Sequence, residues 1–416
     1  YPNRLLIEVK DLESFKVAGE KLTVGAYLRV SDSDDCAIIA MINSYSIVKQ
    51  EDAERHYQLD AIPIGFLDAD GKFHRGGSNI AIPPTGVKPT TKRDVSKIYG
   101  QIEPEKSFHF STLSFDSSVQ VLIDGDKFFN KHIAIVGSTG CGKSCTLATI
   151  LRKATEAKIE GYQGLNNSHI VVFDLHDEYR AAFPDANHLD ITNLQLPYWL
   201  MNGEELEELL VESGENQAYN QANLLRRIVT HNKKKHNDSE EILFDTPVKF
   251  SMREVLNCIV NLSSETRDAR QPSKSMIKDA PAVFDSDEEK FTRYFEKVFQ
   301  FEETKQTHIN KGTYNDGTLE KFISRMRWKS GDKKLNFLFG SEAESLSFED
   351  VVRQLLGYKK ESEANVTVID VSGVPFDVLS ITVSLISRML FDFGYYHKRN
   401  ESDGSPKTPL LLVYEE

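Results

Sequence analysis

Residues Gly137 to Ser144 have the types and spacing that bind a polyphosphate. They read Gly-Ser-Thr-Gly-Cys-Gly-Lys-Ser, which fits the pattern G-x-x-x-x-G-K-S. Glycines let the backbone curve around phosphate oxygens, so that N–H groups and the start of the next helix point at them. In this pattern Lys143 reaches the β- and γ-phosphates and the Ser144 hydroxyl ligates Mg²⁺. The predicted nucleotide contacts are Gly137, Ser138, Thr139, Gly140, Cys141, Gly142, Lys143, Ser144 and Cys145.

The elements on both sides of this loop agree with that interpretation. An apolar run, His132–Val136, precedes it and predicts a strand, and a helical pattern follows from Cys145 to Lys158. A phosphate-binding loop requires this strand–loop–helix context. The sequence therefore predicts a nucleotide site and not a chance match in a glycine-containing loop.

Size and composition describe an ordinary globular protein. At 416 residues two or three domains are expected, and 40% hydrophobic with 27% charged residues is typical of this class. No apolar run approaches the roughly 20 residues that span a bilayer, and the first residues carry no signal-peptide pattern. The four cysteines form no CxxC pair. These features predict a reduced, cytoplasmic protein without a membrane partner.

The net charge of −13 limits how the chain can contact nucleic acid. A protein that coats DNA over its whole surface is expected to be basic, so any contact must be local, such as a channel lining. The densest basic runs are Lys233–Lys235 and Lys329–Lys334. Either run fits a phosphate-contacting surface, and solvated helix ends explain them equally well.

The pattern of residues changes along the chain. The first hundred residues contain short strand-like runs with Gly and Pro punctuation, including a hairpin turn at Asp68–Gly71, and predict a small β-barrel. From about Phe108 the pattern becomes α/β. A polar, helix-rich segment follows, within which residues 263–290 lack periodicity and predict a mobile loop.

Three later apolar runs each end in acidic residues. They are Ile170–Asp174, Val366–Asp370 and Leu410–Glu416, and continuous apolar runs suit central strands of a parallel sheet. Hydrolysis of a nucleotide needs an acidic group near Mg²⁺ and a carboxylate that orients water. Asp370 begins a D-x-x-G pattern typical of GTPases, but it lies far from Lys143 in sequence and no Asn-Lys-x-Asp is present. Asp174 and the pair Glu415-Glu416 remain the candidates, since adjacent carboxylates repel each other unless a cation such as Mg²⁺ is near.

Taken together, these motifs resemble the HerA family of hexameric ATPases, relatives of the FtsK DNA translocases. The matching pieces, in chain order, are a β-rich N-terminus with Gly19 to Val30, the loop from His132 to Ser144, Phe173-Asp-Leu-His-Asp-Glu-Tyr179, Leu196-Pro-Tyr-Trp-Leu200, Thr367-Val-Ile-Asp-Val-Ser-Gly373 and Leu411-Leu-Val-Tyr-Glu-Glu416. One departure is Asp177, which stands where the family usually has glycine in His-Gly-Glu-Tyr.

The resemblance implies an α/β fold with a RecA-like P-loop NTPase core, an N-terminal barrel like that of ATP synthase subunits, and an inserted helical bundle. The implied boundaries are 1–107 for the barrel, 108–196 for the first part of the core, 197–364 for the insertion, and 365–416 for the second part, whose C-terminal remainder is missing. Glu415 would take the metal-side position together with Ser144, and Glu416 the catalytic position beside Lys143. Asp174 and Glu178 would be secondary members of the nucleotide site.

The same resemblance implies partners. A ring, expected to be a hexamer, would use ATP and Mg²⁺ to move on DNA in a central channel, and an arginine beyond residue 416 would act on the neighbour's ATP. Within this chain Arg325 and Arg327 are interface candidates, with helix-surface arginines as the alternative. The effector expected is a NurA-type nuclease, a sirtuin-like NADase or another defence nuclease, in anti-phage defence or DNA repair. A gated scaffold with little helicase activity and a monomeric P-loop kinase are the other hypotheses.

Overall fold

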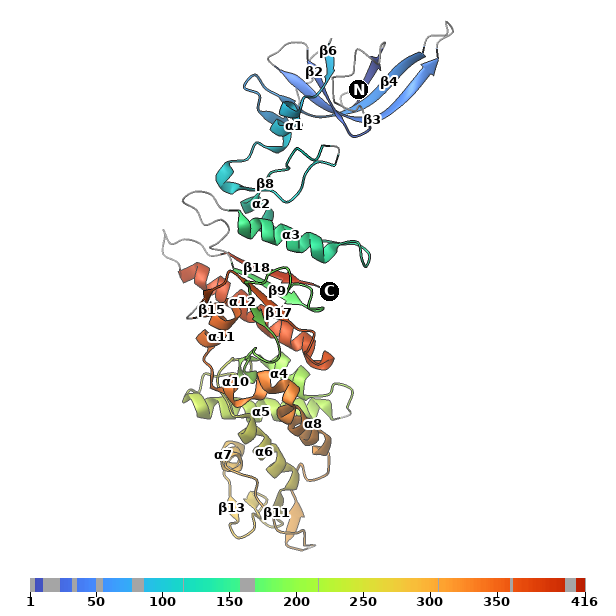
Figure 1. The fold of residues 1–416 in the computed structure, drawn as a ribbon. Helices are drawn as coiled ribbons and strands as arrows, with labels where there is room; N and C mark the ends of the chain where they lie inside the picture. Colours follow the sequence, from blue (N-terminus) through green and yellow to red (C-terminus); the bar gives the residue numbers. More distant parts are fainter. Residues whose placement is uncertain are drawn as a thin grey trace. The chain divides into compact units, whose positions relative to one another are not determined.

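The computed structural model describes residues 4–9, 23–31, 36–49, 55–76, 86–114, 116–157, 169–215, 217–305, 307–359, 362–400 and 409–415. The chain divides into two compact units, residues 1–166 and 167–416 (Figure 1). The predicted N-terminal barrel, its boundaries and the other domain boundaries stay predictions.

An antiparallel sheet forms the first part of unit 1. Its strands follow the order β1-β4-β3-β2-β6, and β5 pairs with the C-terminal end of β4. The bounds are Leu5–Val9 (β1), Tyr27–Ser31 (β2), Ala37–Lys49 (β3), Arg55–Leu67 (β4), Phe73–Arg75 (β5) and Gly86–Pro89 (β6). The predicted hairpin turn is present, because Gly71, at φ 75°, donates its N–H to the Asp68 carbonyl. No pairing between β1 and β6 closes this sheet within the described residues.

The second part of unit 1 carries the predicted nucleotide loop. Its elements are α1 (Lys92–Tyr99), β7 (Ser107–Phe108), β8 (Ile123–Asp124), α2 (Gly125–Phe129) and α3 (Lys143–Glu156). One face of α3 packs through Ile150 and Ala154 against Phe108. The predicted strand at His132–Val136 is wrong: the segment forms no hydrogen-bonded strand, and Val136 is 88% exposed. A strand requires a paired neighbour, and no described residue pairs with this segment.

A parallel sheet lies at the centre of unit 2. Its order is β10-β17-β9-β18, with bounds Asn187–Leu189 (β10), Val366–Asp370 (β17), His169–Asp174 (β9) and Leu410–Tyr414 (β18). All pairings in this sheet are parallel, and every residue of β9 is buried. The three apolar runs therefore form parallel strands, as predicted. The long helix α12 (Phe376–Asn400) shares one hydrophobic core with the sheet and with the helices of residues 203–355.

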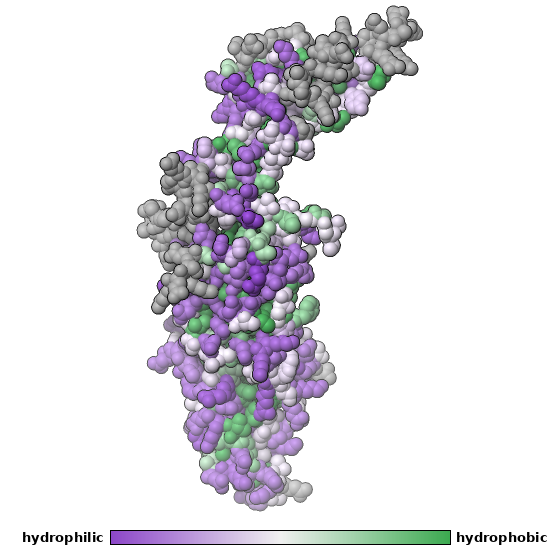
Figure 2. Space-filling model, in the orientation of Figure 1, coloured by the Kyte–Doolittle hydropathy of each residue, from purple (hydrophilic) through white to green (hydrophobic). Residues whose placement is uncertain are grey.

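The helix-rich segment between β10 and β17 has well-defined elements. These are α4 (Gly203–Leu210), α5 (Ala218–Asn237), α6 (Met252–Ser264), β11 (Thr266–Asp268), β12 (Lys274–Ser275), β13 (Ala282–Val283), α7 (Asp287–Phe295), β14 (Ile309–Lys311), α8 (Glu320–Gly331), α9 (Asn336–Phe339), α10 (Ser341–Ser345), α11 (Phe348–Leu355), β15 (Tyr358–Lys359) and β16 (Ser362–Glu363). Hydrophilic side chains cover most of the face of this segment that Figure 2 shows.

The mobile loop predicted for residues 263–290 is wrong. This stretch contains the end of α6, three strands and the start of α7. β11, β12 and β13 join β14 in an antiparallel sheet, and the backbone N–H and C=O groups of these strands bond to one another. The local sequence pattern gives no sign of this pairing. Burial also shows that this stretch is folded, since Ile277 and Phe284 belong to the main hydrophobic core of unit 2.

Candidate nucleotide-binding site

The backbone of the loop at residues 137–144 depends on two glycines. Gly140 and Gly142 have φ values of 80° and 93°, which side chains rarely adopt. Nothing lies within 4 Å of a Cβ placed on either residue, so the requirement for glycine comes from the backbone angle and not from space. Gly142 directly precedes α3, and the loop therefore turns sharply into the start of that helix.

A second feature of the loop is its closure by Lys143. The Lys143 Nζ atom donates to the Gly137 carbonyl at 3.1 Å, and the Cys141 N–H donates to the Ser138 carbonyl at 3.2 Å. A Cβ on Gly137 would lie 2.3 Å from the Cys141 sulfur, so a larger residue there would displace the thiol. The Lys143 ammonium thus lies against the backbone of the loop.

The donor groups of this loop fit a nucleotide phosphate with Mg²⁺. The start of α3 offers backbone N–H groups that the helix geometry leaves without an intrahelical acceptor, and its dipole favours an anion. Lys143 supplies a positive charge, and Ser144 a partly exposed hydroxyl. In the described parts of the chain no three His, Cys, Asp or Glu side chains gather as a metal site. A Mg²⁺ ion here would rely mainly on phosphate and water oxygens, as is usual for this metal.

Asp174, predicted as a secondary member of the site, anchors the loop that follows β9. Its side chain is fully buried. One carboxylate oxygen accepts from the N–H groups of His176 and Glu178, both at 3.2 Å, and the other from Tyr179 N–H at 2.9 Å. Asp174 therefore determines the path of residues 174–179, and Glu178 is presented on the exposed side of that path.

Asp177 preserves the turn that a glycine would make. Its φ is 54°, in the left-handed region that glycine adopts freely and that aspartate tolerates better than most residues. Asp177, at the position of the family's glycine, thus adopts an angle that is strained for a residue with a Cβ. Its carboxylate accepts from Arg180 at 3.4 Å, where both side chains are about half exposed.

The acidic strand ends meet at one edge of the parallel sheet. Asp370 of β17 is in register with Asp174 of β9, and Tyr414 of β18 is in register with Phe173. Glu415 follows directly and donates its N–H to the Phe173 carbonyl at 3.3 Å. Asp370 accepts from its own turn, at Ser372 N–H, 2.9 Å away. The structure thus brings Asp174, Asp370 and Glu415 together, whereas Glu416 lies outside the described residues.

Tyr179 is a member of this edge that the sequence motif contained without suggesting a role. It is 1% exposed, and its ring stacks on Phe183. Burial raises the pKa of the Tyr179 hydroxyl, and the charges of Glu415 and Asp174 raise it further. The phenol therefore stays protonated beside Glu415. The loop at residues 137–144 belongs to unit 1 and this acidic edge to unit 2.

Most of the basic residues that the sequence suggested for DNA are engaged internally. Lys233 is fully buried, and its ammonium donates to the carbonyls of Phe244 and Thr246. Lys234 pairs with Glu240 at 3.0 Å. Lys329 is 7% exposed and pairs with Asp377 at 2.8 Å. Lys233 is therefore neither a phosphate contact nor a solvated helix end, which corrects both interpretations for that residue.

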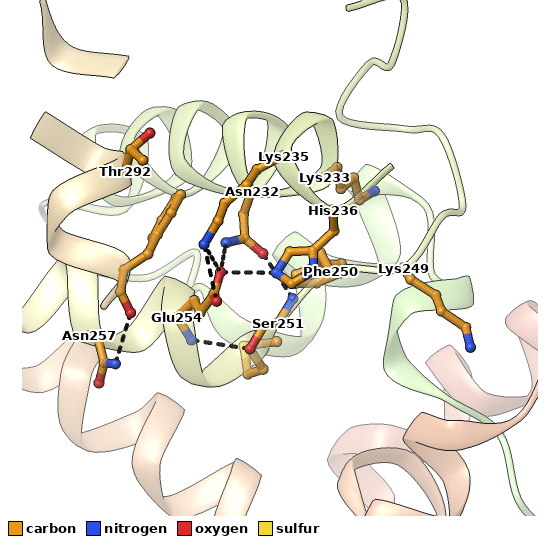
Figure 3. Close-up of polar contacts among 12 residues, drawn as sticks. Asn232, Lys233, Lys235, His236, Lys249, Phe250, Ser251, Glu254, Asn257 and Thr292 are labelled. Atoms are coloured by element: carbon orange, nitrogen blue, oxygen red, sulfur yellow. Dashed lines mark hydrogen bonds and ion pairs between the residues drawn. The ribbon is translucent and has the colours of Figure 1, made fainter. Parts of the chain in front are cut away.

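Glu254 of α6 organises the rest of this basic run (Figure 3). Its carboxylate accepts from Asn232 at 2.7 Å, from His236 at 2.9 Å and from Lys235 at 3.1 Å. Burial would raise the pKa of Glu254, but these three donors lower it below its ordinary value. Lys233 points away from this cluster, although it lies on the same helix (Figure 3). The run therefore joins α5 to α6.

The two arginines proposed for a subunit interface differ. Arg325 forms an ion pair with Glu215 and donates to the Leu210 carbonyl at 3.1 Å, with only 16% of its side chain exposed. Arg327 is exposed on α8. Arg325 thus has a structural role within unit 2, and its proposed interface role is not needed to explain its position.

The comparisons with known proteins agree with these features. A family model described as "Helicase HerA, central domain" matches residues 108–390. A Methanocaldococcus jannaschii protein named "Probable helicase MJ1565" is 26% identical over 201 residues, which are 42% of this chain and 35% of the relative. The chain thus spans about a third of the length of that curated relative. No described helix is both long and apolar enough to cross a membrane. Because the family match extends over most of the chain, the protein belongs to the HerA family of helicase-like ATPases.

Proposed function

We propose that this chain binds and hydrolyses ATP with Mg²⁺ and, as a ring of identical subunits expected to be a hexamer, couples hydrolysis to movement on DNA. The observation that carries the proposal is the loop at residues 137–144. Gly140 and Gly142 turn it in the left-handed region into α3, and Lys143 closes it. Membership of the HerA family supports ATP as the ligand.

Each residue of the loop then has a chemical role. Lys143 would exchange its contact with the Gly137 carbonyl for phosphate oxygens, and the Ser144 hydroxyl would hold Mg²⁺. Bound Mg²⁺ would neutralise phosphate charge during transfer. Glu415 would take the metal-side position, as the resemblance implies. Glu416 would orient the attacking water, as the resemblance implies.

Replacement of Lys143 tests this assignment. Lys143→Ala removes the charge that faces the phosphates, and we expect ATP turnover to fall by at least about 100-fold. The matched control is Lys153→Ala, on the same helix, whose exposed ammonium pairs with Glu156 at 3.1 Å. Turnover that is unchanged in Lys143→Ala would refute the site.

DNA movement requires its own test. Purified protein should bind DNA with an affinity that decreases as salt increases, because phosphate contacts release counterions. Electron microscopy of the same sample should show rings. ATP hydrolysis without displacement of a labelled strand or of a roadblock protein would contradict the motor.

A second function is favoured by a specific observation. The chain has a net charge of −13, and Lys233, Lys234, Lys235 and Lys329 are all held by internal partners. This arrangement leaves fewer cations for a DNA channel and suits a ring that gates an effector, such as a NurA-type nuclease or a sirtuin-like NADase. Co-purification of the genomically neighbouring protein, followed by effector assays with and without ATP, separates this gate from a motor.

A further inference from the structure

The C-terminal half of α8 carries an exposed tryptophan beside an exposed arginine. Trp328 is 59% exposed, and Arg327 is exposed as well. The opposite face of α8 packs into the core of unit 2 through Phe322, and Lys329 pairs with Asp377 at 2.8 Å. The helix is therefore fixed on its buried side, and the Trp328 ring is presented to solvent by a firmly packed element.

Two lysines follow directly, in the turn after α8. The Asp332 carboxylate accepts from the Lys334 N–H at 2.9 Å and begins a short 3₁₀ turn over Lys333–Leu335. Leu335 is 1% exposed and anchors the turn, whereas Lys333 and Lys334 are exposed. The turn thus presents both lysines next to the helix end that carries Trp328. Arg327, Trp328, Lys333 and Lys334 are called the α8 surface below.

The cations of the α8 surface have no acidic partner. Other exposed arginines of unit 2 form ion pairs, such as Arg353 with Glu349 at 2.8 Å. In the part of the chain that the structure describes, no carboxylate pairs with Arg327, Lys333 or Lys334. The dipole at the end of a helix favours nearby cations, but it gives no reason for an exposed indole ring among them. In a chain of net charge −13, such a surface suits an anionic partner that also has flat apolar faces.

A second exposed aromatic ring lies at the start of α12. Phe376 is 92% exposed and directly precedes Asp377, whose carboxylate accepts from the Lys329 ammonium. Trp328 directly precedes Lys329. This ion pair therefore brings the end of α8 and the start of α12, each with an exposed ring, to the same region of unit 2.

We propose that the α8 surface binds single-stranded DNA: a base stacks on Trp328, and the three cations contact neighbouring phosphates. The inference rests on the proposed movement on DNA and names the strand and the residues that meet it. Sites for single strands combine aromatic rings with a cationic track, because every base has a flat face and every phosphate carries a charge. In a duplex the base faces cover one another, so the exposed ring favours an unpaired strand.

The two tryptophans of the chain make the stacking directly observable. Trp199 is only 4% exposed, whereas Trp328 is open to solvent. Addition of a single-stranded oligothymidylate should therefore quench the tryptophan fluorescence of the parent protein. Trp328→Phe should abolish the quenching while it keeps a ring for binding. Quenching that persists in Trp328→Phe, or DNA binding by the parent without any quenching, would overturn the inference.

Fluorescence anisotropy of a labelled oligothymidylate measures the contribution of the ring to affinity. Trp328→Ala should weaken binding by at least about 5-fold, and Trp328→Phe should weaken it less. Tyr219→Ala is the matched control, because Tyr219 is a 78% exposed aromatic residue on α5. Its affinity should equal that of the parent. Equal affinities of Trp328→Ala and the parent would contradict the inference alone.

The salt dependence of the same binding tests the cations. Replacement of Arg327, Lys333 and Lys334 together by glutamine should lower the slope of log affinity against log salt by about 2, since each phosphate contact on a single strand contributes about 0.7. Arg353→Gln, which removes a cation that already has a carboxylate partner, should leave the slope unchanged. A slope that is the same in the triple variant and the parent would show that these cations do not meet phosphates.

Further outcomes identify a wrong partner. All variants are compared at a temperature where their circular dichroism equals that of the parent. A loss in Trp328→Ala that is as large for duplex DNA would contradict stacking on an unpaired base. Normal DNA binding with loss of a co-purifying protein would assign the α8 surface to a protein partner and overturn the inference. Absence of any DNA binding by the parent would contradict the proposed movement on DNA as well.

Discussion

The ammonium of Lys233 lies 2.6 Å from the carbonyl oxygen of Phe244, within the interior of unit 2. A second bond, of 2.8 Å, reaches the Thr246 carbonyl, and the rings of Phe244 and Phe250 lie beside the same ammonium. The loop that Lys233 holds also contacts α4, because Asp245 accepts from Gly203 N–H at 3.0 Å. One lysine of an apparently solvated run thus fastens the 244–246 segment to α5.

Replacement of Lys233 should therefore destabilise unit 2 without changing DNA binding. Lys233→Met leaves two carbonyl oxygens without their donor, and we expect the free energy of unfolding to fall by roughly 1–3 kcal/mol. Denaturant titration measures this change. Lys234→Met should stay within about 0.5 kcal/mol, because the half-buried Lys234 pairs only with the exposed Glu240. A lower salt dependence of DNA affinity in Lys233→Met, with normal stability, would contradict this assignment.

The same residue predicts a pH dependence of stability. Burial lowers the pKa of Lys233 from 10.5 to about 8, so the unfolded chain binds more protons than the folded chain between these two values. The cost of burying the charge is fully present below about pH 8 and is relieved as the pH rises towards 10.5. The stability of the parent relative to Lys233→Met should therefore increase across this window, by at most roughly 3 kcal/mol. Denaturant titrations of both proteins at pH 7.5 and 10 provide the measurement, and a difference that stays constant or decreases would contradict it.

Asp177 predicts a stabilising substitution. Because its φ of 54° is costly for any residue with a Cβ, Asp177→Gly should raise the free energy of unfolding by about 0.5–1 kcal/mol. Asp238, at φ 49° after α5, should behave in the same way. Asp185→Gly is the control, since Asp185 has no positive φ. There glycine should lower the free energy of unfolding, because it increases the conformational entropy of the unfolded chain. Thermal unfolding of the three variants tests the ranking, and destabilisation by Asp177→Gly would show that the aspartate side chain contributes more than the strain.

Cys141 offers a chemical probe of the nucleotide loop. Its thiol is exposed and lies over Gly137, whose carbonyl holds Lys143. ATP with Mg²⁺ should therefore slow its alkylation by a maleimide several-fold, in a Cys145→Ser background. Mass spectrometry of peptides gives the rate, and Cys36, an exposed thiol next to β3, is the internal control. Equal rates for Cys141 with and without nucleotide would place the ligand elsewhere.

Some features of this protein follow from short stretches of sequence. The nucleotide loop could be predicted because its chemistry depends on eight adjacent residues, and the structure shows Gly140 and Gly142 at the angles that only glycine adopts easily. The three apolar runs with acidic ends could be predicted as parallel strands because they lack alternating polar residues, and burial on both faces explains this for β9 and β17. The HerA family followed from the order of these motifs, and its model matches residues 108–390.

Other features depended on residues distant in sequence. Lys233, Arg325 and Lys329 resemble surface charges in sequence, and their partners at residues 244, 215 and 377 came near only when helices packed. The strand β11 needed the distant β14 as its second neighbour, and Asp174 and Glu415 came to one sheet edge only through the pairing of β9 with β18. Sequence alone therefore determined features that depend on adjacent residues, such as the nucleotide loop and the apolar strands. The tertiary structure decided which charges are buried and which partners they meet, because desolvation and hydrogen bonding between distant segments have no local sequence signal.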